Sequence, residues 1–156
     1  MVKTPVYMDN HSTTRVDPRV VAAMLPCFDS TYGNAGSTSH PYGWDAAEIV
    51  DQSRLVLSQA LGCTDREVRF TSGATESNNL AILGLADYGA RTGRKHIIST
   101  AIEHKAVLEP LEQMQKRGFE VDLLPVTPGG YVEPDTVGQH LRPDTLLVSV
   151  MHANNE

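Results

Sequence analysis

Strand-like segments recur along the second half of the chain with one helical pattern between each pair. Runs rich in β-branched and apolar residues begin near residues 67, 96, 120 and 145, at intervals of about 25 residues. A strand, a helix and a further strand within that length form a right-handed crossover between parallel strands. The sequence therefore predicts an α/β fold with a mainly parallel sheet and flanking helices. The expected strands are Glu67 to Phe70, His96 to Ser99, Glu120 to Leu124 and Thr145 to Val150.

Helical patterns fill the intervals between these strands and the first part of the chain. The expected helices are a short one after Asp17 that ends near Pro26, one from Asp45 to Leu61, a well-buried one around Leu80 to Leu85, one from about His104 to Gly118, and one from Pro134 to Leu141. Gly62 stands where a left-handed residue ends a helix. The segment 32–43 contains three glycines and a proline, so we expect a long surface loop there.

Charge and apolar run length exclude several classes of partner. Thirteen Lys and Arg residues against nineteen Asp and Glu give a net charge of −6, which disfavours a nucleic-acid partner. No apolar run approaches the ~20 residues needed to cross a bilayer, and the first residues do not resemble a signal peptide. We expect a cytoplasmic chain. Its two cysteines, Cys27 and Cys63, are expected to be free thiols, and no spacing of His or Cys indicates a metal site.

Small ligands bind outside the carboxyl ends of the strands in such sheets. Three segments follow expected strands at that edge: Thr71–Thr75, Thr100–His104 and Met151–Glu156. We therefore expect these segments to face one cleft and to carry the chemistry of the protein.

The segment 71–75 lies where a strand is expected to lead into a helix. The unpaired N–H groups and the positive end of the helix dipole at such a turn favour an anion, and Gly73 and Ala74 let a phosphate approach closely. Hydroxyl groups at positions 71, 72 and 75 add hydrogen-bond donors. The alternative is that Ser72 or Thr75 only caps the helix, with Glu76 in its first turn. The residues alone support a phosphate-binding turn and a simple helix cap about equally.

His104 and the amides near the end of the chain are the other candidates. A neutral imidazole at His104 could stack on a planar ligand or move a proton, although an exposed His at a helix start is an equally ordinary role. Asn154 and Asn155 could donate to a phenolate or carboxylate oxygen, or could be turn residues. Lys105 is expected to point away from the cleft as a solvated charge.

Several motifs together resemble cysteine desulfurases of the NifS/IscS type. They are the segments 7–18, 32–44, 70–79, 103–108 and 148–156, which occur in order along essentially the whole chain. The resemblance implies the aspartate-aminotransferase-like fold (fold type I) of enzymes that use pyridoxal 5'-phosphate (PLP), and a homodimer. It further implies transfer of sulfur from L-cysteine to an enzyme persulfide, with alanine released. The sulfur would then pass to acceptor or scaffold proteins for iron–sulfur cluster assembly or thiolation.

The resemblance also implies roles for individual residues. Gly73, Ala74 and Thr75 match the phosphate-binding turn. His104 matches the histidine that stacks on the pyridine ring and assists proton transfers, which makes it the implied catalytic residue. Asn155 matches the amide side chain that lies near both the phenolic oxygen of the ring and the substrate. His11 departs from the family pattern, which usually carries Ala at that position.

Three groups that the family requires have no match in this chain. The Lys that bonds to the cofactor, the Asp that pairs with the ring nitrogen and the Cys that receives sulfur all lie beyond the position matching Glu156. We therefore expect residues 1–156 to be an amino-terminal segment plus an incomplete PLP-binding large domain, inactive alone, with the remainder of that domain and the small domain absent. The alternatives are a selenocysteine lyase or another PLP-dependent lyase or aminotransferase, and a stand-alone binding module without catalysis.

Overall fold

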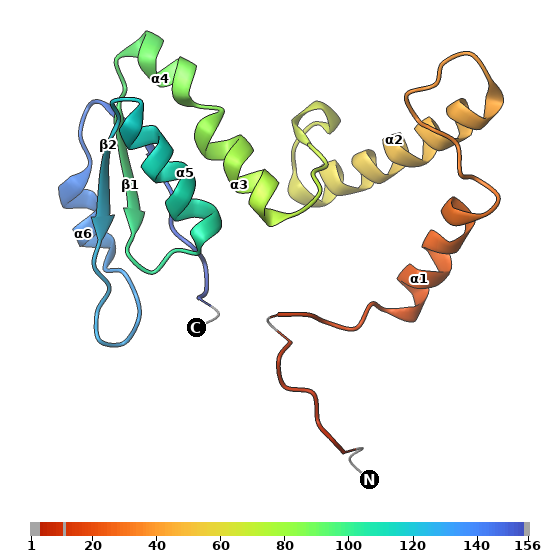
Figure 1. The fold of residues 1–156 in the computed structure, drawn as a ribbon, viewed down its shortest axis with the longest axis horizontal. Helices are drawn as coiled ribbons and strands as arrows, with labels where there is room; N and C mark the ends of the chain where they lie inside the picture. The colour runs from red at the N-terminus through yellow and green to blue at the C-terminus, as the bar shows by residue number, and fades with distance from the viewer. Residues whose placement is uncertain (1–3, 11, 155–156) are drawn as a thin grey trace. The chain divides into compact units, whose positions relative to one another are not determined.

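The parallel sheet of this chain lies in the second of two compact units. The computed structural model describes residues 4–10 and 12–154 (Figure 1). The chain divides into the units Met1–Phe70 and Thr71–Glu156. Across the described ranges, no helix has both the length and the apolar character that crossing a membrane requires.

The sheet consists of three parallel strands in the described residues. These are β1 (His96–Thr100), β2 (Glu120–Leu124) and β3 (Thr145–Val148), arranged in the order β2-β1-β3. The central strand pairs on both sides: His96 lies opposite Glu120 of β2 and opposite Thr145 of β3. All five residues of β1 are buried as a result. The predicted α/β class and three of the four expected strands are confirmed.

Helices connect and cover the strands. The second unit contains α3 (Ala74–Leu83), α4 (Ala86–Thr92), α5 (Lys105–Lys116) and α6 (Pro134–His140). The predicted helices that start near His104 and Pro134 are therefore confirmed. The crossover through α5 leads from the central strand to β2, whereas the crossover through α6 returns past β1 to β3. Right-handed connections in opposite directions place α5 and α6 on opposite faces of the sheet.

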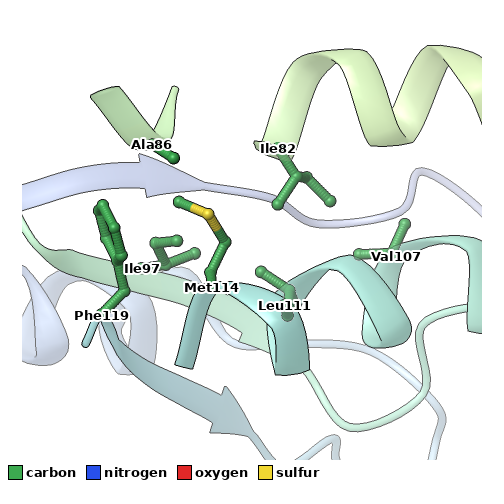
Figure 2. Close-up of a cluster of buried hydrophobic side chains, with 7 residues drawn as sticks. All are labelled: Ile82, Ala86, Ile97, Val107, Leu111, Met114 and Phe119. Carbon is green, nitrogen blue, oxygen red and sulfur yellow. The ribbon is translucent and has the colours of Figure 1, made fainter. Parts of the chain in front are cut away.

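The core of the second unit lies between β1 and the helices α3, α4 and α5. Figure 2 shows its buried side chains, which are Ile82, Ala86, Ile97, Val107, Leu111, Met114 and Phe119. Three of them recur along one face of α5 with the spacing of a helical stripe. Because this stripe packs on the central strand, it fixes where α5 begins relative to the carboxyl end of β1.

Polar side chains tie the three strands together at the opposite, amino edge of the sheet. The side chain of His96 is fully buried, with Nδ1 2.8 Å from Thr145 Oγ1 and Nε2 3.2 Å from Asp122 Oδ2. Nearby, the guanidinium of Arg142 donates to both carboxylate oxygens of Glu120, at 3.0 and 2.9 Å. These hydrogen bonds lower the pKa of Glu120. Each link joins β2 or β3 to its neighbours and thereby fixes the strand register.

The strand predicted from Glu67 to Phe70 is wrong. A short 3-10 helix, η2 (Asp65–Glu67), occupies its start, and the residues after it pair with no described strand. The carboxylate of Glu67 accepts the backbone N–H of Thr64 at 2.8 Å and so stabilises the turn. The carbonyl of Val68 accepts instead from the guanidinium of Arg54, at 2.7 Å. A local alternation of apolar residues thus formed no ladder, because other groups satisfy its backbone.

Two other expectations fail in part. The helix expected to be well buried around Leu80 to Leu85 ends at Leu83, and Leu80 is 56% exposed because only the face carrying Ile82 meets the core. The last strand ends at Val148, not at Val150, and Val148 is exposed. β3 pairs with β1 on one side only, so its apolar residues are less covered than those of a central strand.

The first unit consists of helices and the loop between them. It contains α1 (Pro18–Met24), η1 (Leu25–Phe28) and α2 (Pro41–Leu61), followed by η2. The carboxylate of Asp17 caps α1, and Gly62 ends α2 at φ 68°, as predicted. The expected long loop lies ahead of α2, and α2 starts at Pro41 rather than at Asp45. A Cβ atom on Gly43 would lie 1.9 Å from the carbonyl oxygen of Ser37, so this close approach requires glycine.

The apolar faces of the first unit are largely uncovered within this chain. Among its described apolar residues only Ala46 and Val68 are buried. The exposed apolar residues of α1, η1 and α2 include Val20, Val21, Met24, Leu25, Phe28, Ile49, Val56, Leu57 and Leu61. The apolar stripes that predicted these helices therefore do not form a core of their own.

We expect Leu111→Ala to lower the free energy of unfolding by about 2–5 kcal/mol, because it leaves a cavity where α5 packs on β1. Leu111 is 2% exposed, whereas the neighbouring Glu112 is exposed. Glu112→Ala is the matched control and should change the free energy by less than about 0.5 kcal/mol. Urea denaturation followed by circular dichroism measures both. Equal effects of the two substitutions would contradict the proposed core.

Candidate functional site

A pocket of about 260 Å³ lies at the carboxyl edge of the sheet. Thr100 and Ile102 line it after β1, residues 150–154 line it after β3, and residues 130–132 line it between β2 and α6. Two of the three segments expected to share a cleft are therefore brought together. The third, Thr71–Thr75, is not part of this lining and lies at the start of α3.

The loop that contains Tyr131 is the part of the pocket that sequence reasoning missed. The N–H of Gly130 donates to the carbonyl of Thr127, and the N–H of Thr127 donates to the carbonyl of Tyr131, both at 2.9 Å. Gly130 adopts φ 80°, which only glycine adopts without strain. A signal existed, because the Pro128-Gly129-Gly130 turn follows a predicted parallel strand and therefore belongs to the carboxyl edge.

The turn before α3 presents backbone N–H groups that no side chain caps. Gly73 is the N-cap residue of α3, and its position has no side-chain hydrogen bond to the helix. The N–H groups of the next residues, Ala74 and Thr75, belong to the first turn, where no intrahelical carbonyl is available. A Cβ atom built on Gly73 would meet no atom within 4 Å, so Gly73 itself is not enclosed by neighbouring atoms. The alternative in which Ser72 or Thr75 caps the helix is wrong.

Glu76 engages Ser72 instead of the helix terminus. Its Oε2 accepts the hydroxyl of Ser72 at 2.6 Å and the N–H of Ser72 at 2.7 Å. Both hydrogen bonds favour the ionised carboxylate, and they lower the pKa of Glu76, the hydroxyl contributing most. Thr71 Oγ1 similarly lies 2.7 Å from Ser77 Oγ. Two of the three hydroxyl groups that were expected to bind an anion, those of Thr71 and Ser72, therefore form hydrogen bonds within the protein instead.

His104 is both the N-cap of α5 and an exposed residue at the carboxyl edge. Its Nδ1 accepts the N–H of Ala106 at 3.0 Å, so the neutral ring carries its proton on Nε2. Figure 1 shows that α3 and α5 both begin on the side of the sheet toward which the strand arrows point. The turn at 73–75 and residue His104, the N-cap of α5, thus belong to the same end of the second unit. Lys105 is exposed, as expected.

The residues after β3 are joined to the loop that precedes His104. The N–H of Met151 donates to Glu103 Oε1 at 2.6 Å, and the side-chain amide of Asn154 donates to the carbonyl of Ile102 at 3.1 Å. The other two candidates, His11 and Asn155, lie outside the described residues. Cys27 is exposed and Cys63 is half-buried, and both are free thiols.

Comparison with known proteins places this arrangement in a family. The sequence profile named "Aminotransferase class-V" matches residues 6–156. The chain belongs to the class-V aminotransferase family. It is 50% identical over 155 residues to "Cysteine desulfurase IscS" of Anaeromyxobacter sp. (strain K). The match covers 99% of this chain and 38% of that relative. The chain thus spans well under half the length of the curated relatives it matches.

Solved structures show the same fold. DndA from Streptomyces lividans is 55% identical, with a TM-score of 0.83 over 97% of this chain and 42% of that one. The structure titled "SspA in complex with cysteine" is 34% identical, with a TM-score of 0.86 over 96% of this chain and 43% of that one. The similarity to cysteine desulfurases of the NifS/IscS type and the fold type I architecture, both predicted from sequence, are confirmed.

We expect Ser72→Ala to raise the pKa of Glu76 from its depressed value toward the ordinary value of 4.5, because the strongest donor to the carboxylate is lost. The backbone N–H of residue 72 remains, so the return is partial. A depressed pKa stabilises the folded state above the unfolded-state pKa, and this contribution is lost as the pH falls through the folded-state pKa. NMR titration of the Glu76 carboxyl carbon measures the change. Ser77→Ala, which removes no donor to Glu76, is the control, and an unchanged pKa in Ser72→Ala would contradict the geometry.

Proposed function

We propose that this chain is the amino-terminal part of a PLP-dependent cysteine desulfurase that acts on L-cysteine. The observation that carries the proposal is the uncapped start of α3 at Gly73, with Ala74 and Thr75 following, in a chain matched along 99% of its length by a curated cysteine desulfurase. A helix terminus of this kind binds a phosphate group. The cysteine bound in the SspA structure supports the choice of substrate.

The residues of this chain would hold the cofactor by three kinds of contact. The N–H groups of Ala74 and Thr75 would donate to the phosphate, His104 would stack on the pyridine ring, and Asn155 would donate to the phenolic oxygen and contact the substrate. The open space in front of Gly73 and the absence of a side-chain cap fit a phosphate at this turn. PLP supplies an electron sink for the carbanion that forms when a bond to the substrate α-carbon breaks.

His104 is suited to proton transfer through one nitrogen. Because Nδ1 accepts the N–H of Ala106, the ring orientation is fixed and Nε2–H is the hydrogen-bond donor that the neutral ring has available. For the ring to transfer this proton, Nδ1 would have to release the N–H of Ala106 and take up a proton, so that the ring alternates between its neutral and imidazolium forms. His104 is therefore the catalytic residue that this chain contributes.

The remaining parts of the site would come from outside this chain. No residue here matches the Lys, Asp and Cys that the family requires, and the curated relative is matched over only 38% of its length. We propose that the chain comprises an amino-terminal segment and an incomplete PLP-binding domain, and that it is inactive alone.

The assembly proposed for the enzyme is a homodimer in the cytoplasm. The many exposed apolar side chains of α1 and α2 support an oligomer, because a partner subunit could cover them. Sulfur-acceptor or scaffold proteins for iron–sulfur cluster assembly or thiolation are the proposed partners of the persulfide.

The test compares the 156-residue chain with the full product of the gene that encodes it, each supplied with PLP and L-cysteine. We expect alanine and protein-bound persulfide from the full product only. In that product His104→Ala should lower kcat by roughly 10²–10⁴-fold, because a positioned proton donor is lost. Lys105→Ala, an exposed neighbour, should leave kcat within about twofold.

Three outcomes would contradict the proposal. A full product that binds PLP and transaminates amino acids without forming persulfide would favour another PLP-dependent lyase or aminotransferase, and release of selenium from selenocysteine in preference to sulfur would favour a selenocysteine lyase. A full product that binds no PLP would favour a non-catalytic binding module.

A further inference from the structure

Glu103 is a buried carboxylate in an otherwise accessible loop. It is 7% exposed, whereas Ala101 and His104 in the same loop are exposed and Ile102 is half-buried. Carboxylates are rarely buried unless they are paired, and none of the ion pairs among the described residues includes Glu103. Its partners are instead uncharged donors of the protein itself.

The main partner of Glu103 is distant in sequence. Oε1 accepts the backbone N–H of Met151 at 2.6 Å, and the hydroxyl of Thr100 donates to the same oxygen at 3.5 Å. One side chain thus joins the loop after β1 to the loop after β3.

This contact continues the sheet beyond its last paired residues. The N–H of Ser149 still donates to the carbonyl of Ile98, at 2.9 Å, but the carbonyl of Thr100, the last residue of β1, accepts the N–H of Glu103 at 3.4 Å. An unpaired N–H at the partly buried position of Met151 would cost free energy. The carboxylate of Glu103 provides the acceptor for this N–H in place of a strand carbonyl.

A further hydrogen bond between the same two loops joins the side-chain amide of Asn154 to the carbonyl of Ile102 at 3.1 Å. The pocket at the carboxyl edge is lined on one side by Thr100 and Ile102 and on another by residues 150–154. The length and direction of the Glu103 side chain therefore set the spacing of these two walls. They also set the position of Met151–Asn154 relative to the start of α5, where His104 lies.

We infer that Glu103 is a positioning residue of the cofactor site, which holds the loop Met151–Asn154 at a fixed distance from His104. The inference rests on the proposed function for the identity of the ligand, which is PLP. The hydrogen bond between Glu103 and Met151 does not depend on the identity of the ligand. Glu103 itself need not touch cofactor or substrate.

The experiment uses the full gene product and three variants. Glu103→Ala removes the acceptor, Glu103→Gln keeps an acceptor oxygen of the same reach, and Glu109→Ala changes an exposed glutamate of α5 as the matched control. Hydrogen–deuterium exchange of the protein without PLP should show at least tenfold faster exchange at the Met151 amide in Glu103→Ala. Exchange in Glu103→Gln should lie within about threefold of the unsubstituted protein, and Glu109→Ala should not differ from it.

The second measurement is the PLP dissociation constant, determined by equilibrium dialysis. We expect it to rise at least tenfold in Glu103→Ala and less than about threefold in Glu103→Gln. A general loss of stability would instead lower the melting temperature without this recovery by Gln. If Glu103→Ala does not fold, Glu103→Gln and Glu103→Asp keep the test open, because Asp retains the charge but is too short to reach Met151 and should weaken PLP binding more than Gln.

The two possible failures are distinguishable. Unchanged exchange at Met151 in Glu103→Ala overturns the link itself, whether or not PLP binds. Faster exchange with an unchanged PLP dissociation constant overturns the positioning role. An unsubstituted protein that binds no PLP, with Met151 exchange still dependent on Glu103, overturns the proposed function and the assignment of the ligand, and leaves only the structural link.

Discussion

The pairing of β1 with a parallel strand on each side is the constraint on which the second unit depends. All five residues of β1 are buried, and the strand is the only one of the three described that has two neighbours. Because both neighbours are parallel to it, the loops after β1 and β3 leave the sheet at the same edge. The core side chains Leu111 and Met114 then pack α5 on this strand and place its first residue at that edge. The position of His104 follows from the pairing and the packing together.

Side chains extend the sheet at both ends where the backbone ladder stops. At the amino edge His96 connects β2 and β3 through Asp122 and Thr145, and at the carboxyl edge Glu103 accepts from Met151. Each contact joins segments far apart in sequence, so each connects elements that no local turn connects. A hydrogen bond that is buried from water also costs more to break than an exposed one. The edge that carries the chemistry is therefore held by polar contacts as well as by the core.

Sequence periodicity predicted where helices form, but it did not show which apolar faces are buried within this chain. The helix at α5 has a stripe that packs on the core, the stripes of α1 and α2 are exposed, and the strands at His96, Glu120 and Thr145 were predicted as short runs rich in β-branched and apolar residues. The strand predicted from Glu67 failed because periodicity cannot tell whether a partner strand exists, and the carbonyl of Val68 is taken by Arg54 instead. The role of Glu103 could not be predicted, because its partner is the backbone of a residue in another loop.

The two helices that begin at the carboxyl edge differ in how their first turns are satisfied. At α5 the ring of His104 accepts the N–H of Ala106, so that terminus already has an acceptor within the chain. At α3 the N-cap is Gly73, which has no side chain, and the carboxylate of Glu76 is directed to Ser72. A helix terminus that retains unpaired N–H groups favours an external anion. This difference between the two helix starts is the physical reason for proposing the phosphate site at α3 and a role in proton transfer for the His104 ring at α5.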